Sequence, residues 1–107
     1  MLKIVDVIVE LIGDVAPIAE KISRKDVALA KQLRDALNSV ALNTAEGGDQ
    51  RGARRANHYA IALGSARESV VALRAAVAWG YVEPMPRPMA NKFDHVIGVL
   101  VKSIAHG

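Results

Sequence analysis

Two glutamates, Glu46 and Glu68, are the residues of this chain best suited to acid–base chemistry. A pair of carboxylates can act as general acid and general base in a hydrolysis, provided that the two groups lie close together. The helices that carry Glu46 and Glu68 would bring them together only by packing antiparallel, and the Glu-x-x-His partners of a di-iron bundle are missing. Hydrolysis by these glutamates is the third of three functional hypotheses.

Other patterns that could support catalysis are incomplete. Ser65 follows Gly64, but no second glycine completes a nucleophile elbow. The three histidines show no metal-ligand spacing, and the chain has no cysteine. Gly47-Gly48 lacks the Lys-Ser/Thr of a phosphate-binding loop, and we expect it to end a helix. The sequence predicts no catalytic residue, no metal site and no cofactor.

A set of polar residues interrupts the apolar stripes of two predicted helices. Asn43 continues the stripe formed by Leu29, Leu33, Ala36 and Val40, so its amide takes a core position. A buried polar group needs hydrogen-bond partners, and helix bundles use such groups to fix the register between helices. We predict a structural polar network rather than an active site, at Ser39, Asn43, Glu46, Ser65 and Glu68.

Three arginines, Arg51, Arg54 and Arg55, lie close together at the start of a predicted helix. The helix dipole favours anions at this end, so cations there reduce stability. A bound phosphate backbone or an acidic partner surface would offset that cost. The alternative is a solvated loop whose arginines maintain solubility, and a net charge of only +3 is compatible with it.

Composition indicates one all-α domain over residues 1–107. Hydrophobic residues make up 51% of the chain but only four residues are aromatic, which is typical of closely packed helices. The absence of cysteine is compatible with a reducing cytoplasm. The apolar amino end carries too many charges for a signal peptide and is too short for a membrane span. We therefore expect a cytoplasmic protein with no membrane partner.

Apolar residues with alternating spacings of four and three predict four helices. The Ser23–Asp26 turn resembles a capping box, with Ser23 as the cap and Asp26 in place of the usual Glu, and Gly80 is a candidate C-terminal cap. Short connections favour an antiparallel up-down-up-down bundle. The predicted helices run from about Leu2 to Ile22, from the Ser23–Asp26 turn to about Glu46, from about Ala53 to Trp79, and from about Met89 to Ala105.

The first predicted helix has a wider apolar face than one bundle core requires. Its polar strip consists of acidic residues four positions apart, which repel one another. A second copy of the chain could cover the apolar face and bring Arg67 and Arg74 against the acidic strip, although a solvated charged face is the simpler alternative. The predicted oligomer interface comprises Val5, Asp6, Glu10, Ile12 and Asp14.

Several motifs between about Leu29 and Val82 resemble those of one family. They are Asn43-Thr44-Ala45-Glu46-Gly47, Gly64-Ser65-x-x-Glu68 and Gly80-Tyr81-Val82. They are similar to the four-helix bundle proteins also called 23S rRNA-intervening sequence proteins, with Thr44 in place of the usual isoleucine. The resemblance implies a left-handed antiparallel bundle, a homopentamer and no enzymatic activity. A related branch is the accessory protein of diversity-generating retroelements, whose basic pentamer binds nucleic acid and a reverse transcriptase.

The leading hypothesis is therefore a homo-oligomeric helical scaffold that binds RNA or DNA without base specificity. The residues proposed to contact nucleic acid are Arg51, Arg54, Arg55, Arg67 and Arg74. The second hypothesis is a protein-interaction module, with a docking surface at Trp79, Tyr81, Met85 and Met89 around the proline-rich connector.

Overall fold

The computed structural model describes the backbone of residues 2–106 and the side chains of residues 4–106. The helices are α1 (Leu2–Ser23), α2 (Val27–Gly48), α3 (Gly52–Ala78) and α4 (Arg87–His106), and residues 2–106 contain no strand. The predicted all-α class and the four predicted helices are confirmed, with each boundary within a few residues of its predicted position.

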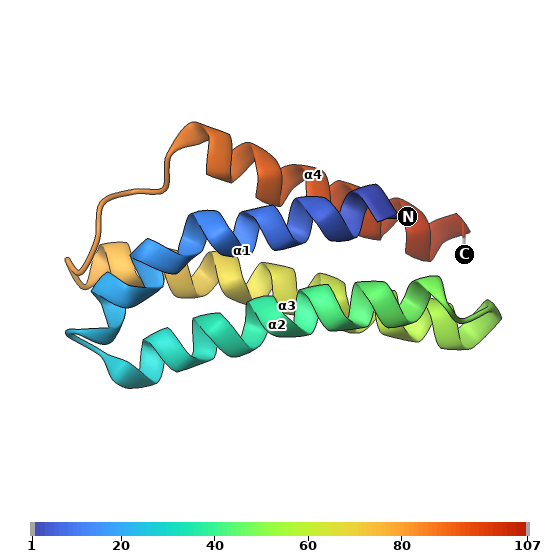
Figure 1. The fold of residues 1–107 in the computed structure, drawn as a ribbon, viewed down its shortest axis with the longest axis horizontal. Coiled ribbons are helices and arrows are strands. Elements are labelled where there is room, and N and C mark those ends of the chain that lie inside the picture. Colours follow the sequence, from blue (N-terminus) through green and yellow to red (C-terminus); the bar gives the residue numbers. More distant parts are fainter. Residues whose placement is uncertain (1, 107) are drawn as a thin grey trace.

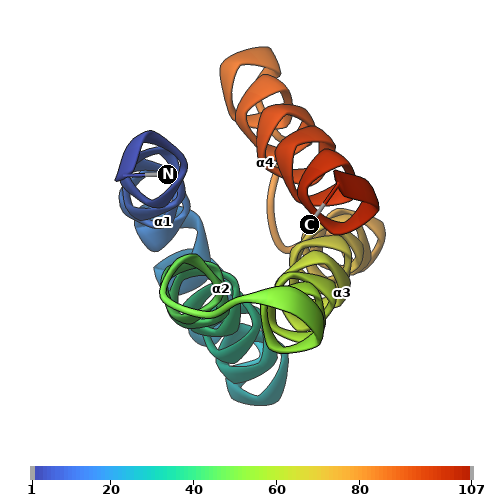
Figure 2. The same ribbon diagram turned by 90° about the vertical axis from the view of Figure 1, so that its right-hand side faces the viewer.

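The four helices contact one another in a ring (Figure 1). Each helix packs on the next one in the chain, and α1 also contacts α4. The α2–α3 pair is the most extensive contact and the α1–α4 pair the least extensive. Figure 2, which looks along the bundle, shows α1 and α4 standing apart above the closely packed α2 and α3. The chain termini lie at the same end of the molecule in Figure 1.

Two clusters of buried side chains form the core. The first lies toward the connector between α3 and α4 and is centred on Leu11, Leu33, Leu73 and Phe93. The second lies toward the termini and includes Ile4, Ile8, Tyr59, Val96 and Leu100. Both clusters draw on residues spaced three or four apart, because that spacing places apolar side chains on one face of a helix. Each fully buried aliphatic side chain contributes about 1.5–3 kcal/mol to folding.

The turn between α1 and α2 differs from the predicted capping box. Asp26 is itself the N-cap of α2, with an extended backbone (φ −154°), and its Oδ1 accepts a hydrogen bond from the Leu29 N–H at 2.9 Å. Ser23 is the last residue of α1, and its hydroxyl donates to the Glu20 carbonyl at 3.0 Å. The prediction of Ser23 as the cap is wrong, because α1 continues one residue beyond its predicted end and incorporates that serine.

Gly80 terminates α3 as predicted. Its φ of +80° is a left-handed conformation that glycine adopts without steric cost. The Gly80 N–H donates to the Val77 carbonyl and the Tyr81 N–H donates to the Ala76 carbonyl, each at 2.9 Å. This pair of bonds is a Schellman motif, which satisfies carbonyl groups at the end of a helix.

Gly47 has a different role from the predicted helix stop. Helix α2 does end at Gly48, but Gly47 is buried and its backbone is not left-handed. A Cβ atom at Gly47 would lie 2.5 Å from Cε1 of Tyr59, so the glycine allows the Tyr59 ring to approach the α2 backbone. The left-handed glycine of this connection is Gly52, with φ of +59°.

We expect Gly47→Ala to lower the free energy of unfolding by about 1–3 kcal/mol, because the new methyl group overpacks the contact with Tyr59. Gly64→Ala is the matched control: a Cβ at this exposed position in α3 meets no atom within 4 Å. The control should gain up to about 1 kcal/mol from its higher helix propensity. Urea unfolding of the two variants measures both effects, and equal stabilities would contradict the assigned role of Gly47.

Candidate nucleic-acid interface

Three of the predicted network residues meet between α2 and α3. The Ser65 hydroxyl donates to Oγ of Ser39 at 2.8 Å across the two helices. Asn43 Nδ2 donates to the Ser39 carbonyl at 3.1 Å and to Ser39 Oγ at 3.2 Å. These half-buried groups satisfy one another, so they fix the register of α2 against α3 without an unpaired polar atom among them.

His58 also belongs to this network, although sequence reasoning did not include it. Its Nδ1 lies 3.0 Å from Oδ1 of Asn43. Because an amide oxygen can only accept, Nδ1 carries the hydrogen in this arrangement and Nε2 is the remaining ring nitrogen. In the antiparallel register set by Ser39 and Ser65, Asn43 faces the turn of α3 around Ile61, and His58 lies about one turn before it. Spacing alone therefore did not predict that His58 would join the network.

Glu46 and Glu68 lie outside the network. Both side chains are exposed, and Glu46 accepts a hydrogen bond from Gln50 at 3.3 Å. The Ser39–Ser65 contact places Glu68 about ten residues from Glu46 along the paired helices, or about 15 Å at the helical rise. The structure therefore does not bring these two carboxylates together.

Arg55 caps the end of α2. Its Nε donates to the Gln50 carbonyl at 2.9 Å and to the Gly47 carbonyl at 3.2 Å, and its Nη2 donates to the Gly48 carbonyl at 3.4 Å. A cation is favourable here because the negative end of the α2 dipole faces it. The position of Arg55 is thus explained by its own chain, with no external anion required.

The other two clustered arginines remain available to a ligand. Arg51 and Arg54 are exposed, and neither takes part in an ion pair within residues 4–106. Arg51 is the N-cap of α3 and makes no side-chain capping bond, so it does not satisfy the free N–H groups of the first turn. Arg67 and Arg74 are exposed farther along the same helix. This end of α3 can attract an anion through both its charges and its N–H groups.

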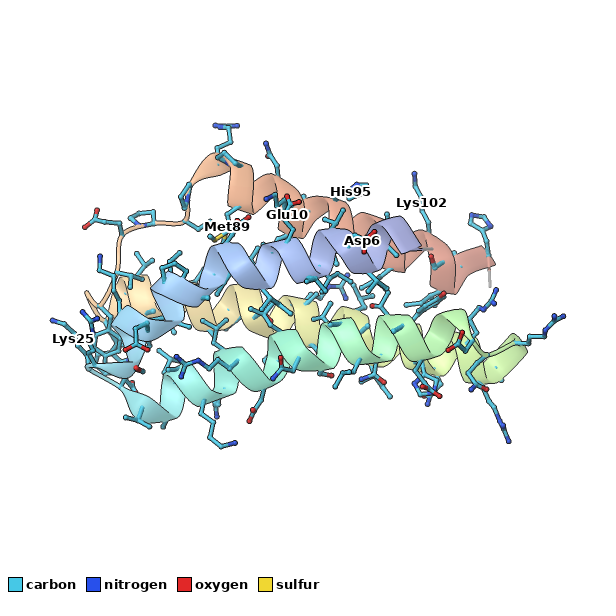
Figure 3. The ribbon with its side chains drawn as sticks, in the orientation of Figure 1. Asp6, Glu10, Lys25, Met89, His95 and Lys102 are labelled. Carbon is cyan, nitrogen blue, oxygen red and sulfur yellow. The ribbon has the colours of Figure 1, made fainter. Side chains whose placement is uncertain are left out.

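The acidic strip of α1 is partly neutralised by α4. Lys92 lies 2.6 Å from Glu10 and 2.5 Å from Asp14, whereas Asp6 is exposed at the preceding turn of α1 (Figure 3). Hydrogen bonds to Asp14 and Glu10 raise the pKa of Lys92 above its ordinary value, and the two negative charges add to that effect against the cost of desolvation. A residue of the same chain therefore performs part of the role predicted for Arg67 and Arg74 of a second copy.

Ile12, from the apolar part of the predicted interface, lines a groove between α1 and α2. Val5 and Ile12 are half-buried, and the neighbouring Val9 is exposed. The groove has a volume of about 260 Å³. Its lining combines apolar side chains with two polar ones at Arg34 and Asn38, and the apolar members are Ile12, Val15, Ala16, Ala19, Leu33 and Leu37.

The predicted docking surface around the connector is mostly covered. Met89 is buried beneath the first turns of α4 (Figure 3), and Tyr81 and Met85 are half-buried against the core. Trp79 alone of the four is exposed, at 70% of its full accessible area. An apolar pocket of about 410 Å³ lies beside the connector, between α3 and the start of α4, with Arg74 and Glu83 as its charged members.

Within residues 4–106, no group of three or more histidine, aspartate or glutamate side chains is placed to hold a metal ion. No helix of the described part of the chain is both long and apolar enough to cross a membrane.

A family model and a solved structure are similar to this chain. The family model described as 23S rRNA-intervening sequence protein matches residues 1–102. A crystal structure from Bacteroides thetaiotaomicron, described as a protein of unknown function from the S23 ribosomal protein family, is similar with a TM-score of 0.79. The two chains are 18% identical, and the similarity covers 94% of this chain and 97% of that one. No curated protein matches the sequence.

We expect Arg55→Gln to lower the free energy of unfolding by about 1–3 kcal/mol, because three backbone carbonyls lose a charged donor. Arg54→Gln removes the same charge from the exposed neighbouring position and should change stability by less than about 0.5 kcal/mol. Thermal and urea unfolding provide the comparison. If both substitutions had the same effect, Arg55 would not be a cap.

We expect Lys92→Met to lower the thermal midpoint at neutral pH, whereas Lys102→Met on the same helix should not, because Lys102 is exposed and forms no ion pair within residues 4–106. A folded-state pKa raised above the unfolded value stabilises the fold below the unfolded pKa and ceases to do so as pH rises through the folded pKa. The stability difference between wild type and Lys92→Met should therefore begin to fall above about pH 10.5 and disappear once the pH exceeds the raised folded-state pKa. A difference that persists there would assign the effect to packing.

Proposed function

The chain belongs to the 23S rRNA-intervening sequence protein family, and from that membership we propose that it is a homo-oligomeric, non-enzymatic helical scaffold that binds RNA or DNA without base specificity. The observation that carries this proposal is the exposed, unpaired state of Arg51 and Arg54 beside the free N–H groups of α3. Phosphates bind to such an arrangement whatever the base sequence, because both the charges and the amide groups contact only the backbone.

The proposed contact surface is smaller than the set of five arginines expected from the sequence. Arg55 is engaged with α2 and is removed from the set. Arg51 and Arg54 form its centre, and Arg67 and Arg74 extend it along α3. The net charge of +3 is small, so the proposal depends on the local position of these cations rather than on the charge of the whole molecule.

The oligomeric part of the proposal concerns α1. We place a second copy against the groove between α1 and α2, since the exposed Val9 and the apolar lining of that groove would both lose contact with water. An antiparallel up-down-up-down bundle is supported by the ring of helix contacts and by the neighbouring termini (Figure 1). A pentamer and a reverse transcriptase partner remain predictions from the family resemblance, and a cytoplasmic location remains a prediction from composition.

A non-enzymatic role is favoured by the positions of the polar side chains. The candidate carboxylates, Glu46 and Glu68, are exposed and far apart along the bundle. The Ser39–Asn43–Ser65 group and His58 use their hydrogen bonds on one another. These groups act in packing α2 against α3, which is a structural task.

The test is the affinity of the nuclease-treated protein for a structured ribosomal RNA fragment, titrated at several salt concentrations. The double variant Arg51→Gln/Arg54→Gln should bind more weakly, and its slope of log affinity against log salt should be shallower by about two, because up to two phosphate contacts are lost. Sedimentation of the same sample should give a mass that is a multiple of the chain mass.

The matched control is Lys31→Gln/Arg34→Gln, which removes the same charge from cations already paired with Asp35 and Glu20. This control should leave the salt slope nearly unchanged. Equal losses in the two double variants would show that binding follows total charge and not this surface, and an absence of binding at low salt would exclude the nucleic-acid role.

A further inference from the structure

Trp79 is an exposed aromatic residue on a rigid support. It is the C-cap of α3, 70% of its area is accessible, and it is the chain's single tryptophan. Its ring stacks on the ring of Tyr81, with a centroid distance of 6.3 Å and an interplanar angle of 16°. The Schellman motif at Gly80 fixes the backbone between the two aromatic residues.

Tyr81 is in turn held by the turn between α1 and α2. Its hydroxyl donates to Oδ2 of Asp26 at 3.2 Å, while Oδ1 of the same carboxylate caps α2. Partial burial raises the pKa of Tyr81 above its ordinary value, and the hydrogen bond and charge of Asp26 add to the shift. Tyr81 also packs against the core, so the Trp79 ring rests on a well-anchored neighbour.

Exposed cations lie next to this support. Arg24 and Lys25 directly precede Asp26, and Lys25 lies at the end of the bundle formed by this turn (Figure 3). Both Asp26 oxygens are occupied by hydrogen bonds, and Glu20 faces Arg34 at 3.5 Å and Arg24 at 3.9 Å. Lys25 has no ion-pair partner within residues 4–106. Acidic groups are also present here: Asp26 and Glu20 are engaged as described, and Glu83 on the connector is exposed.

We propose that Trp79 is a stacking platform for an unpaired base of single-stranded RNA or DNA, with Lys25 contacting an adjacent phosphate. An exposed aromatic ring beside flexible cations is the combination that single-strand binding uses, because every base has a π-face and every nucleotide a phosphate. The α1–α2 turn supplies the cation, Lys25, that this combination requires. The apolar pocket beside the connector makes a protein contact at Trp79 the alternative outcome of the test.

This inference rests on the proposed function and adds a second contact. The new site lies at the end of the bundle with the α1–α2 turn, whereas Arg51 and Arg54 lie at the other end, with the α2–α3 connection (Figure 1). One strand that follows the bundle could contact both sites, or separate strands could occupy them. Either arrangement makes the preference for unpaired bases a property of the Trp79 end.

The single tryptophan provides a direct probe, because stacking of a base on an indole quenches its fluorescence. We would titrate the unmodified full chain with an oligouridylate of about 12 nucleotides, within the range of single-strand site sizes, and with a duplex of the same length. The single strand should quench Trp79 emission and the duplex should not. Affinity measured with a labelled oligonucleotide should fall about 5- to 100-fold in Trp79→Ala and much less in Trp79→Phe.

Leu42→Ala is the matched control, because Leu42 is a 69% exposed apolar residue on α2, outside the residues proposed to contact nucleic acid. It should bind as the wild type does. The variant Lys25→Gln should keep the quenching at saturation but weaken binding and reduce the salt slope by up to about one.

The outcomes separate this inference from the proposed function. Salt-dependent binding that depends on Arg51 and Arg54, with no quenching and no loss in Trp79→Ala, would overturn the stacking site and leave the proposed function standing. Absence of binding to any RNA or DNA would overturn both and leave Trp79 as a contact for a protein. Equal quenching by single strand and duplex would also overturn the stacking site.

Discussion

The close approach of α2 to α3 is the constraint on which the rest of the structure depends. Gly47 provides it, because a Cβ at this position would collide with the Tyr59 ring. At that separation the Ser39 and Ser65 hydroxyls lie 2.8 Å apart and the Arg55 guanidinium reaches the last carbonyls of α2. Three kinds of contact therefore fix the position of α2 against α3: close packing, hydrogen bonding and the charge of Arg55. Helices α1 and α4 pack on this pair and contact each other less extensively.

The free and the engaged cations have different tasks. Arg55 neutralises the end of α2, and Lys92 joins α1 to α4 by binding Glu10 and Asp14. Both cations are paired with groups of the same chain, so they contribute little to the electrostatic attraction of an external anion. Among the exposed cations without an ion-pair partner in residues 4–106, Arg51 and Arg54 lie at the start of α3 and Lys25 in the α1–α2 turn. A molecule with a small net charge can in this way present two local sites for phosphate.

Helix α1 leaves apolar surface exposed to water and one acidic side chain, Asp6, without an ion-pair partner in residues 4–106. Its acidic strip is satisfied by α4 at two of its three positions, but the exposed Val9 and the groove beside α2 leave apolar surface in water. The core also contains one unfavourable group, since the buried Thr44 hydroxyl finds no hydrogen-bond partner within residues 4–106. These features lower the stability of the fold locally, and the contact between α2 and α3 offsets them. Contact with a second copy at the groove would bury the exposed apolar surface and so add stability.

The sequence by itself determined the helices, their apolar faces, the Gly80 terminus and the shared character of Ser39, Asn43 and Ser65, because these depend on spacing within one segment. Only the tertiary structure decided which group meets which. The sequence predicts Arg55 as a ligand contact, whereas in the fold it caps the end of α2. It predicts Gly47 as part of a helix stop, whereas in the fold Gly47 also makes room for the Tyr59 ring. His58 and Lys92 have their partners on other helices, at Asn43 and at Glu10 and Asp14. The register of α2 against α3 keeps Glu46 and Glu68 apart. Periodicity fixes the face of a helix on which a side chain lies, whereas its partner depends on the relative position of two helices that no single segment encodes.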